Sequence, residues 1–223
     1  MHFDLQPLIL TFQLALIVTI ILFVIGVPLA YWIAFSNNRL KYIVETLVSM
    51  PLVLPPTVIG FYLLIVFSPQ YFLGHFLQSY LGIRVVFSFT GLVIGSVLFS
   101  LPFMVNPIKA GLQHFPLALM EASYVLGKSS WETLRRVILP NIKPALLTGI
   151  VMAFAHTIGE FGVVLMIGGN IPGETRLASI AIYDQVEALN YDTAGLYALM
   201  LVIISFIILL VFYYLNRKPL KIF

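Results

Sequence analysis

Two ionisable side chains, His156 and Glu160, lie four residues apart inside a long apolar stretch. In an α-helix this spacing places both on one face, where an acid and a base could act together. A carboxylate in hydrocarbon is costly, so Glu160 should face a polar pathway, contact a partner subunit or carry a proton. The alternative is a position near a membrane surface, where the side chain reaches water. No second acid, base or nucleophile accompanies the pair, which argues against catalysis.

Two further patterns could do chemistry, and neither is complete. Residues 127–130 (Gly-Lys-Ser-Ser) resemble the end of a phosphate-binding loop, but Ala122 stands where that loop needs its first glycine. A helical pattern precedes it in place of a strand, so we expect no nucleotide site in this chain. His2, His75 and His114 lack the spacing of metal ligands, and no cysteine is present, so we expect no metal site either.

The composition identifies the environment that must hold these residues. Hydrophobic residues make up 61% of the 223 positions and charged residues 9%, with a mean hydropathy of +1.03. A soluble domain is about half apolar and a quarter charged. The chain is therefore predicted to be an integral membrane protein, and its net charge of +3 carries little weight as a sign of nucleic-acid binding.

Five apolar stretches are long enough to cross a bilayer, which takes about 20 helical residues. They are apolar around their whole circumference, without the alternation of a barrel strand, so we expect α-helices. The prediction is an all-α bundle of five transmembrane helices forming one domain over residues 1–223. The expected spans are about 8–35, 46–67, 86–108, 144–167 and 193–215.

The basic residues predict the orientation. Ten of the twelve Lys and Arg residues fall on one side of the expected spans, and only Arg84 and Arg176 fall on the other. Basic loops face the cytoplasm, so the N-terminus is expected outside and the C-terminus inside. The ten are Arg39, Lys41, Lys109, Lys128, Arg135, Arg136, Lys143, Arg217, Lys218 and Lys221.

Two connections are long enough to hold structure of their own. Loop 109–143, on the expected cytoplasmic side, contains a helical pattern over 116–126 that ends at Gly127. A second helix is expected over 131–139, capped by Ser130 and ended by Pro140. Loop 168–192, on the expected outer side, reads as a turn followed by a short helix over 177–188.

Three prolines interrupt the second expected span, namely Pro51, Pro55 and Pro56. Each removes a backbone donor, and the carbonyls that this frees are tolerated where protein or a water-filled cavity surrounds them. The helix therefore faces the interior of the bundle or is simply kinked, and the sequence leaves both readings open. The loop over 68–85 is expected to lie partly in the membrane interface.

The segment Glu121–Gly127, followed thirteen residues later by Pro140, resembles the EAA signature of binding-protein-dependent ABC importer permeases. In that family the segment is the coupling helix, which docks into a groove on the cytoplasmic ATPase. One departure is Ser123, a small residue in place of the second alanine. The resemblance implies that the ATPase contacts Glu121, Ala122, Ser123, Tyr124, Leu126, Gly127 and Lys128.

Three more segments, 51–56, 159–162 and 169–176, resemble the permeases of molybdate importers, with sulfate permeases as near relatives. The resemblance implies an external gate near Glu160 and an outer face that receives a substrate-binding protein. The residues expected at the gate are Pro55, Pro56, His156, Glu160 and Phe161. Those expected to face the binding protein are Asn170, Pro172, Gly173, Glu174 and Arg176.

The expected function is a permease for a tetrahedral oxyanion, molybdate or tungstate, in the cytoplasmic membrane of a bacterium or archaeon. Five spans are too few to enclose a pathway, so a homodimer in the lipid bilayer is expected. Two cytoplasmic ATPases would bind ATP and Mg, an extracytoplasmic protein would deliver the anion, and no cofactor or nucleic acid is expected on this chain. A sulfate or thiosulfate permease, an intramembrane enzyme using Glu160 and His156, and a passive channel remain alternatives.

Overall fold

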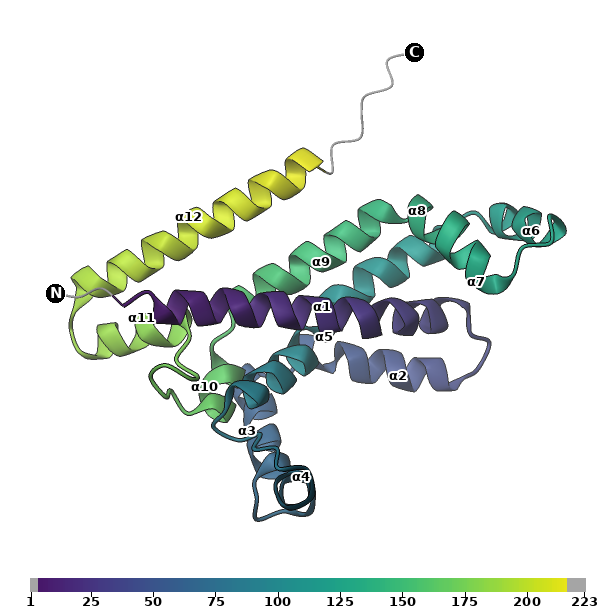
Figure 1. Cartoon of the computed structure of the whole chain (residues 1–223). Coiled ribbons are helices and arrows are strands. Elements are labelled where there is room, and N and C mark those ends of the chain that lie inside the picture. Colours follow the sequence, from purple (N-terminus) through teal and green to yellow (C-terminus); the bar gives the residue numbers. More distant parts are fainter. Residues whose placement is uncertain (1–3, 216–223) are drawn as a thin grey trace.

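The computed structural model describes residues 4–215, and these residues form helices and connecting turns without a strand. Within this described part, three helices are long and apolar enough to cross a membrane: α1 (Gln6–Phe35), α5 (Phe89–Gln113) and α12 (Tyr191–Leu215). Two bent pairs of helices, Leu40–Leu52 with Pro56–Phe67 and Ser130–Asn141 with Lys143–Ile158, pass the same test when each pair is taken together, which gives up to five spans among these residues. The all-α membrane fold expected from the sequence is confirmed (Figure 1).

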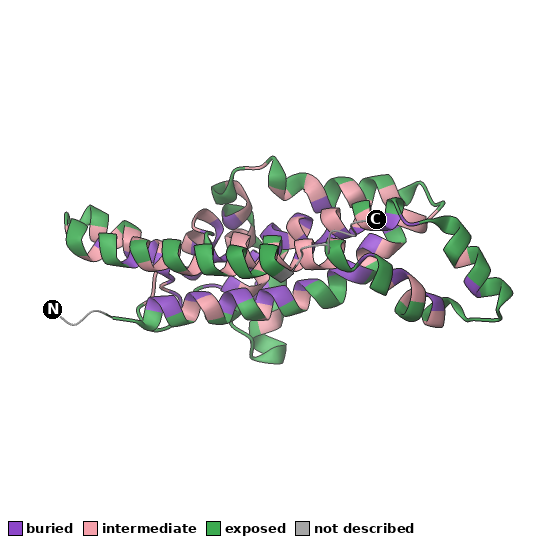
Figure 2. Ribbon diagram, turned by 90° about the horizontal axis from the view of Figure 1, so that it is seen from above, coloured by how far each residue is buried: buried purple, intermediate pink, exposed green. Residues whose placement is uncertain are grey.

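The core of the bundle lies where α1 and α5 pack against each other and against α9 (Lys143–Ile158). Its fully buried side chains include Leu14, Leu22, Met104 and Ile108. Buried and exposed residues alternate around these helices (Figure 2). Many of the exposed residues are large and apolar, so apolar side chains also cover the outer surface of the bundle. An apolar exterior is stable against lipid but not against water, which agrees with the composition.

The second expected span is not one continuous helix. The chain forms α2 (Leu40–Ser49), a 3₁₀ turn (Met50–Leu52) and then α3 (Pro56–Phe67), with a bend of 113° between the two halves. Pro51, Pro55 and Pro56 explain the break, since each lacks the N–H of a helical hydrogen bond and restricts the residue before it. After the bend, α3 projects away from the bundle and leads to α4 (Phe72–Leu81), a helix not expected from the sequence (Figure 1).

The fourth expected span is also divided. Helix α9 ends at Ile158, residues 159–161 are not helical, and α10 (Gly162–Gly168) completes the segment. The expectation of an unbroken helix over 144–167 was therefore wrong. Gly159, whose backbone amide bonds to the carbonyls of Ala155 and His156, closes the last turn of α9.

The connection between α5 and α9 contains α6 (Leu117–Val125), α7 (Ser130–Thr133), a π-helical turn (Leu134–Ile138) and α8 (Leu139–Asn141). Gly127 ends the first helix as expected, with φ of +75°. Pro140 does not end the second, because helical structure continues to Asn141. The wider π turn, in which the Leu139 amide bonds to the Leu134 carbonyl five residues back, accommodates the proline ring.

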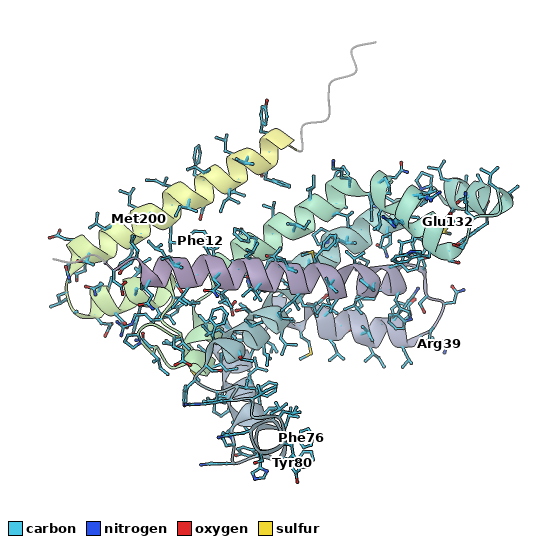
Figure 3. The ribbon with its side chains drawn as sticks, in the orientation of Figure 1. Phe12, Arg39, Phe76, Tyr80, Glu132 and Met200 are labelled. Atoms are coloured by element: carbon cyan, nitrogen blue, oxygen red, sulfur yellow. The ribbon has the colours of Figure 1, made fainter. Side chains whose placement is uncertain are left out.

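The two ends of the bundle carry different loops. Helices α6, α7 and α8 lie at one end, which we call the α6 end, together with Arg39 and Glu132 (Figure 3). The short helix α11 (Ala178–Glu187), close to its expected position, lies at the opposite end beside the start of α1 (Figure 1). Arg217, Lys218 and Lys221, which contributed to the expected orientation, lie outside the described residues.

Candidate functional site

The two broken spans meet at their breaks. Helix α3 packs along α10, and two glycines at this contact have little room for a side chain. A Cβ atom on Gly60 would lie 3.2 Å from the Cα of Val163, and one on Gly162 would lie 2.8 Å from the Cβ of Pro56. Discontinuous helices that meet inside the membrane expose backbone groups to a cavity, which is how many transporters form their pathway.

A pocket of about 550 Å³ lies at this meeting point and collects most of the residues expected at the gate. Pro56, His156, Glu160 and Phe161 all line it. Pro55 does not line it and instead precedes the first turn of α3. His156 and Glu160 do not share a helix face, since α9 ends between them, so that detail of the expectation was wrong.

Glu160 is buried, with 3% of its surface exposed, in the non-helical link between α9 and α10. Neither carboxyl oxygen has a hydrogen-bond partner among residues 4–215. The buried hydroxyl of Ser96 on α5 also lacks one. The Glu160 backbone is held in place, because Ser179 donates a hydrogen bond of 2.7 Å to its carbonyl oxygen. A buried carboxyl group without a hydrogen-bond partner is costly as a charged group, which makes Glu160 a candidate functional residue.

His156 is held by a different set of contacts. Its Nδ1 atom lies 2.9 Å from the Ser100 hydroxyl, and its ring stacks on Phe103 with 3.9 Å between centroids. Within the described residues it forms no ion pair with a carboxylate, and no cluster of three potential metal ligands exists there. The site therefore holds a histidine anchored by Ser100 and a carboxyl group that is not hydrogen-bonded to it.

The segment expected to contact an ATPase forms an exposed projection at the α6 end (Figure 3). Ser123 is the exception: it is buried, and its hydroxyl lies 2.9 Å from that of Thr133, which ties α6 to α7. Val125 and Leu126 are 88% and 78% exposed, and an exposed apolar surface of this kind is typical of protein contacts. The remaining expected residues, Glu121, Ala122, Tyr124, Gly127 and Lys128, are exposed as well.

The turn at the opposite end is tied together by one carboxylate. Asp184 of α11 accepts hydrogen bonds from the Asn170 amide at 2.9 and 3.0 Å and pairs with Arg176 at 3.3 Å. Arg176 also donates to the Asn170 side-chain oxygen at 2.8 Å. This network holds the residues at the tip exposed, namely Pro172, Gly173 and Glu174.

Two residues that stabilise this outer turn were not predicted from the sequence. Thr175 is buried and donates to the Gly168 carbonyl at 2.7 Å, closing the base of the turn. Asp184 lies fourteen residues from Asn170 on another helix, so no local spacing connects the two. The threonine could have been found as a hydroxyl within a turn, since such residues bond to nearby backbone groups.

Comparison with known proteins agrees with this geometry. Residues 26–220 match the family described as the binding-protein-dependent transport system inner membrane component. The chain belongs to this family of transport permeases. It is a multi-pass membrane protein of the inner membrane, as the family description and its apolar helices together indicate.

Individual relatives cover nearly the whole permease chain. The molybdenum transport system permease protein ModB of Azotobacter vinelandii is 43% identical over 94% of this chain and 93% of its own length. A probable sulfate transport system permease protein of Chlorokybus atmophyticus is 34% identical over 90% of this chain and 70% of its own. The fold is that of a chain in the inward-facing MetNI methionine ABC transporter, with a TM-score of 0.75 at 18% identity over 96% of this chain and 95% of that one.

Proposed function

We propose that the chain is the membrane permease subunit of an ATP-driven importer for a tetrahedral oxyanion, with molybdate as substrate and tungstate as its close chemical equivalent. The observation that carries this proposal is the meeting of the two helix breaks beside Pro56 and Glu160. Relatives named as molybdenum transport permeases support the choice of anion.

The partners follow from the division of surfaces on the chain. The exposed, partly apolar α6 projection suits docking to a cytoplasmic ATPase, which would carry ATP and Mg. The turn at residues 170–176 suits contact with an extracytoplasmic binding protein. Both assignments require an orientation with the N-terminus outside the cell and the C-terminus inside. This orientation agrees with the basic residues at the α6 end. Two copies would surround one pathway.

The connectivity suggests how movement at the α6 end reaches the pocket. Helix α5, which contributes Phe99 to the pocket, leads into α6, while α7 leads through α8 into α9, which carries His156, so both helices continue into the projection. Ser123 and Thr133 join the two halves of that projection. A displacement imposed by the ATPase would therefore move α5 and α9 together, and the breaks allow α3 and α10 to respond separately.

The test is uptake by the complex of this permease with its ATPase and binding protein in proteoliposomes. Radiolabelled molybdate should accumulate only with ATP, and unlabelled tungstate should compete. Accumulation of sulfate in preference to molybdate would replace the substrate assignment with the sulfate alternative, which the sulfate-permease relatives favour. Flux that is independent of ATP would indicate a passive channel, and a reaction catalysed by the purified chain alone would indicate an enzyme.

A further inference from the structure

Helix α2 carries a polar stripe that neither the gate nor the coupling segment uses. Tyr42, Glu45, Thr46 and Ser49 recur at intervals of three and four residues and so lie on one face of the helix. They line a groove of about 630 Å³ that continues over Met50 and Val53.

The other faces of α2 have different surroundings. Ile43 and Leu47 are each 59% exposed on an apolar face suited to lipid. Val48 is 4% exposed and belongs to the core. The carboxylate and hydroxyl groups on the remaining face favour a border with water or a polar surface over hydrocarbon.

Along the chain, the groove ends close to the candidate gate. Helix α2 begins next to Arg39 at the α6 end and ends at the 3₁₀ turn that precedes Pro56 (Figures 1 and 3). The helical rise places Ser49 about 14 Å along the axis from Leu40. In chain order, Leu54 is the last residue that lines the groove, and Pro56 is the first residue that lines the pocket at the helix breaks.

One charge in the groove is matched by a charge from α5. The Glu45 carboxylate forms an ion pair with the Lys109 ammonium group. Within residues 4–215 this is the one ion pair that joins two spans, since the others lie within the loops at the two ends. The lysine is the more buried partner, with 17% of its side chain exposed against 35% for the glutamate.

We propose that this groove is the cytoplasmic half of the oxyanion pathway, and that Lys109 cancels the charge of Glu45 so that a dianion can leave through it. The inference rests on the proposed oxyanion transport. The hydroxyls of Tyr42 and Ser49 are suitable donors to oxygen atoms that can only accept hydrogen bonds. The Thr46 hydroxyl instead donates to the Tyr42 carbonyl at 2.7 Å and contributes its oxygen and methyl group.

The first experiment separates a pathway charge from a structural ion pair. Lys109→Met leaves Glu45 as a bare carboxylate in the groove, and molybdate uptake should fall about tenfold or more. Glu45→Gln leaves a cation, so uptake should stay within about threefold of the original protein. The double variant should recover to a similar level. Equal losses in both single variants, without recovery in the double, would overturn the proposal.

The second experiment maps access along α2. The chain contains no cysteine, so Ser49→Cys and Thr46→Cys can be compared with Ile43→Cys and Leu47→Cys on the same helix. An impermeant anionic thiol reagent applied to the cytoplasmic side of the complex should label the first two positions and spare the other two, and molybdate should slow the labelling. Labelling of the apolar positions instead would contradict the assignment.

The two proposals fail in different ways. If the original complex accumulates no oxyanion, the proposed function is wrong whatever the labelling pattern. If it accumulates molybdate and Lys109→Met transports as well as the original protein, only the assignment of the groove is wrong. ATP hydrolysis is measured in each variant. This measurement distinguishes a variant in which the permease is no longer coupled to the ATPase from one in which the pathway itself is impaired.

Discussion

Gly162 lies directly against Pro56, so that a Cβ atom on the glycine would be 2.8 Å from the Cβ of the proline. One residue begins α10 and the other begins α3, each just after the break in its span. This contact makes the two interruptions a single structural feature. Both spans must open there together or slide past one another.

Substitution of Gly162 by alanine should therefore disturb the meeting of the breaks. The added methyl group has to displace the ring of Pro56, and overpacking of this kind typically costs about 1–3 kcal/mol. We expect a lower unfolding temperature in detergent and reduced uptake. Gly195→Ala in α12, where a Cβ would meet nothing within 4 Å, is the matched control and should leave both quantities unchanged or slightly raised. Equal effects of the two substitutions would show that the contact is unimportant.

Substitution of Gly127 by valine tests the coupling role of α6. A Cβ there has open space, so the cost is limited to the left-handed backbone, φ +75°, at about 1–2 kcal/mol. We expect intact membrane insertion with ATP hydrolysis no longer coupled to uptake, measured on the same proteoliposomes. Gly82→Val carries the same kind of strain, with φ +66° and open space, at the end of α4. Uncoupling by both variants, or by neither, would count against a specific role for Gly127.

Glu160→Gln tests the buried carboxyl group. The amide is uncharged and of the same shape, so it suits a site where the carboxyl oxygens have no partner among the described residues. We expect uptake within about threefold of the original and an equal or higher unfolding temperature. Glu160→Arg introduces a buried side chain that stays positively charged and should prevent assembly. A Gln variant that assembles and hydrolyses ATP but transports nothing would mean that the negative charge itself is needed.

Asp184→Ala tests the rigidity of the outer turn. It removes the acceptor shared by Asn170 and Arg176, each of which then loses a charge-assisted contact worth about 1–3 kcal/mol. Stimulation of ATP hydrolysis by the binding protein should fall about fivefold or more, with the unstimulated rate preserved. Glu187→Ala, an exposed carboxylate on the same helix, should leave stimulation unchanged. A similar loss in both variants would point to overall charge as the cause.

The amino-acid sequence alone predicted the membrane environment, the all-α fold, the turn at Gly127 and the short helix near 178–187. These features depend on hydropathy and on local backbone preferences, which neighbouring residues determine. Pro51, Pro55 and Pro56 predicted a helix in the second span that is kinked or faces the bundle interior. They did not predict the break or its bend of 113°, which depends on what α3 packs against.

The gate and the groove depended on contacts between segments far apart in the chain. From local sequence, His156 and Glu160 are expected one turn apart on a single helix. In the structure the helix is broken between them, and the segment after the break packs against α3 and α11. The pairing of Glu45 with Lys109 joins residues 64 positions apart, and that of Asn170 with Asp184 joins two separate elements. The spacing of polar residues shows only which face of a helix is polar. Which residues contact that face depends on how the helices pack together.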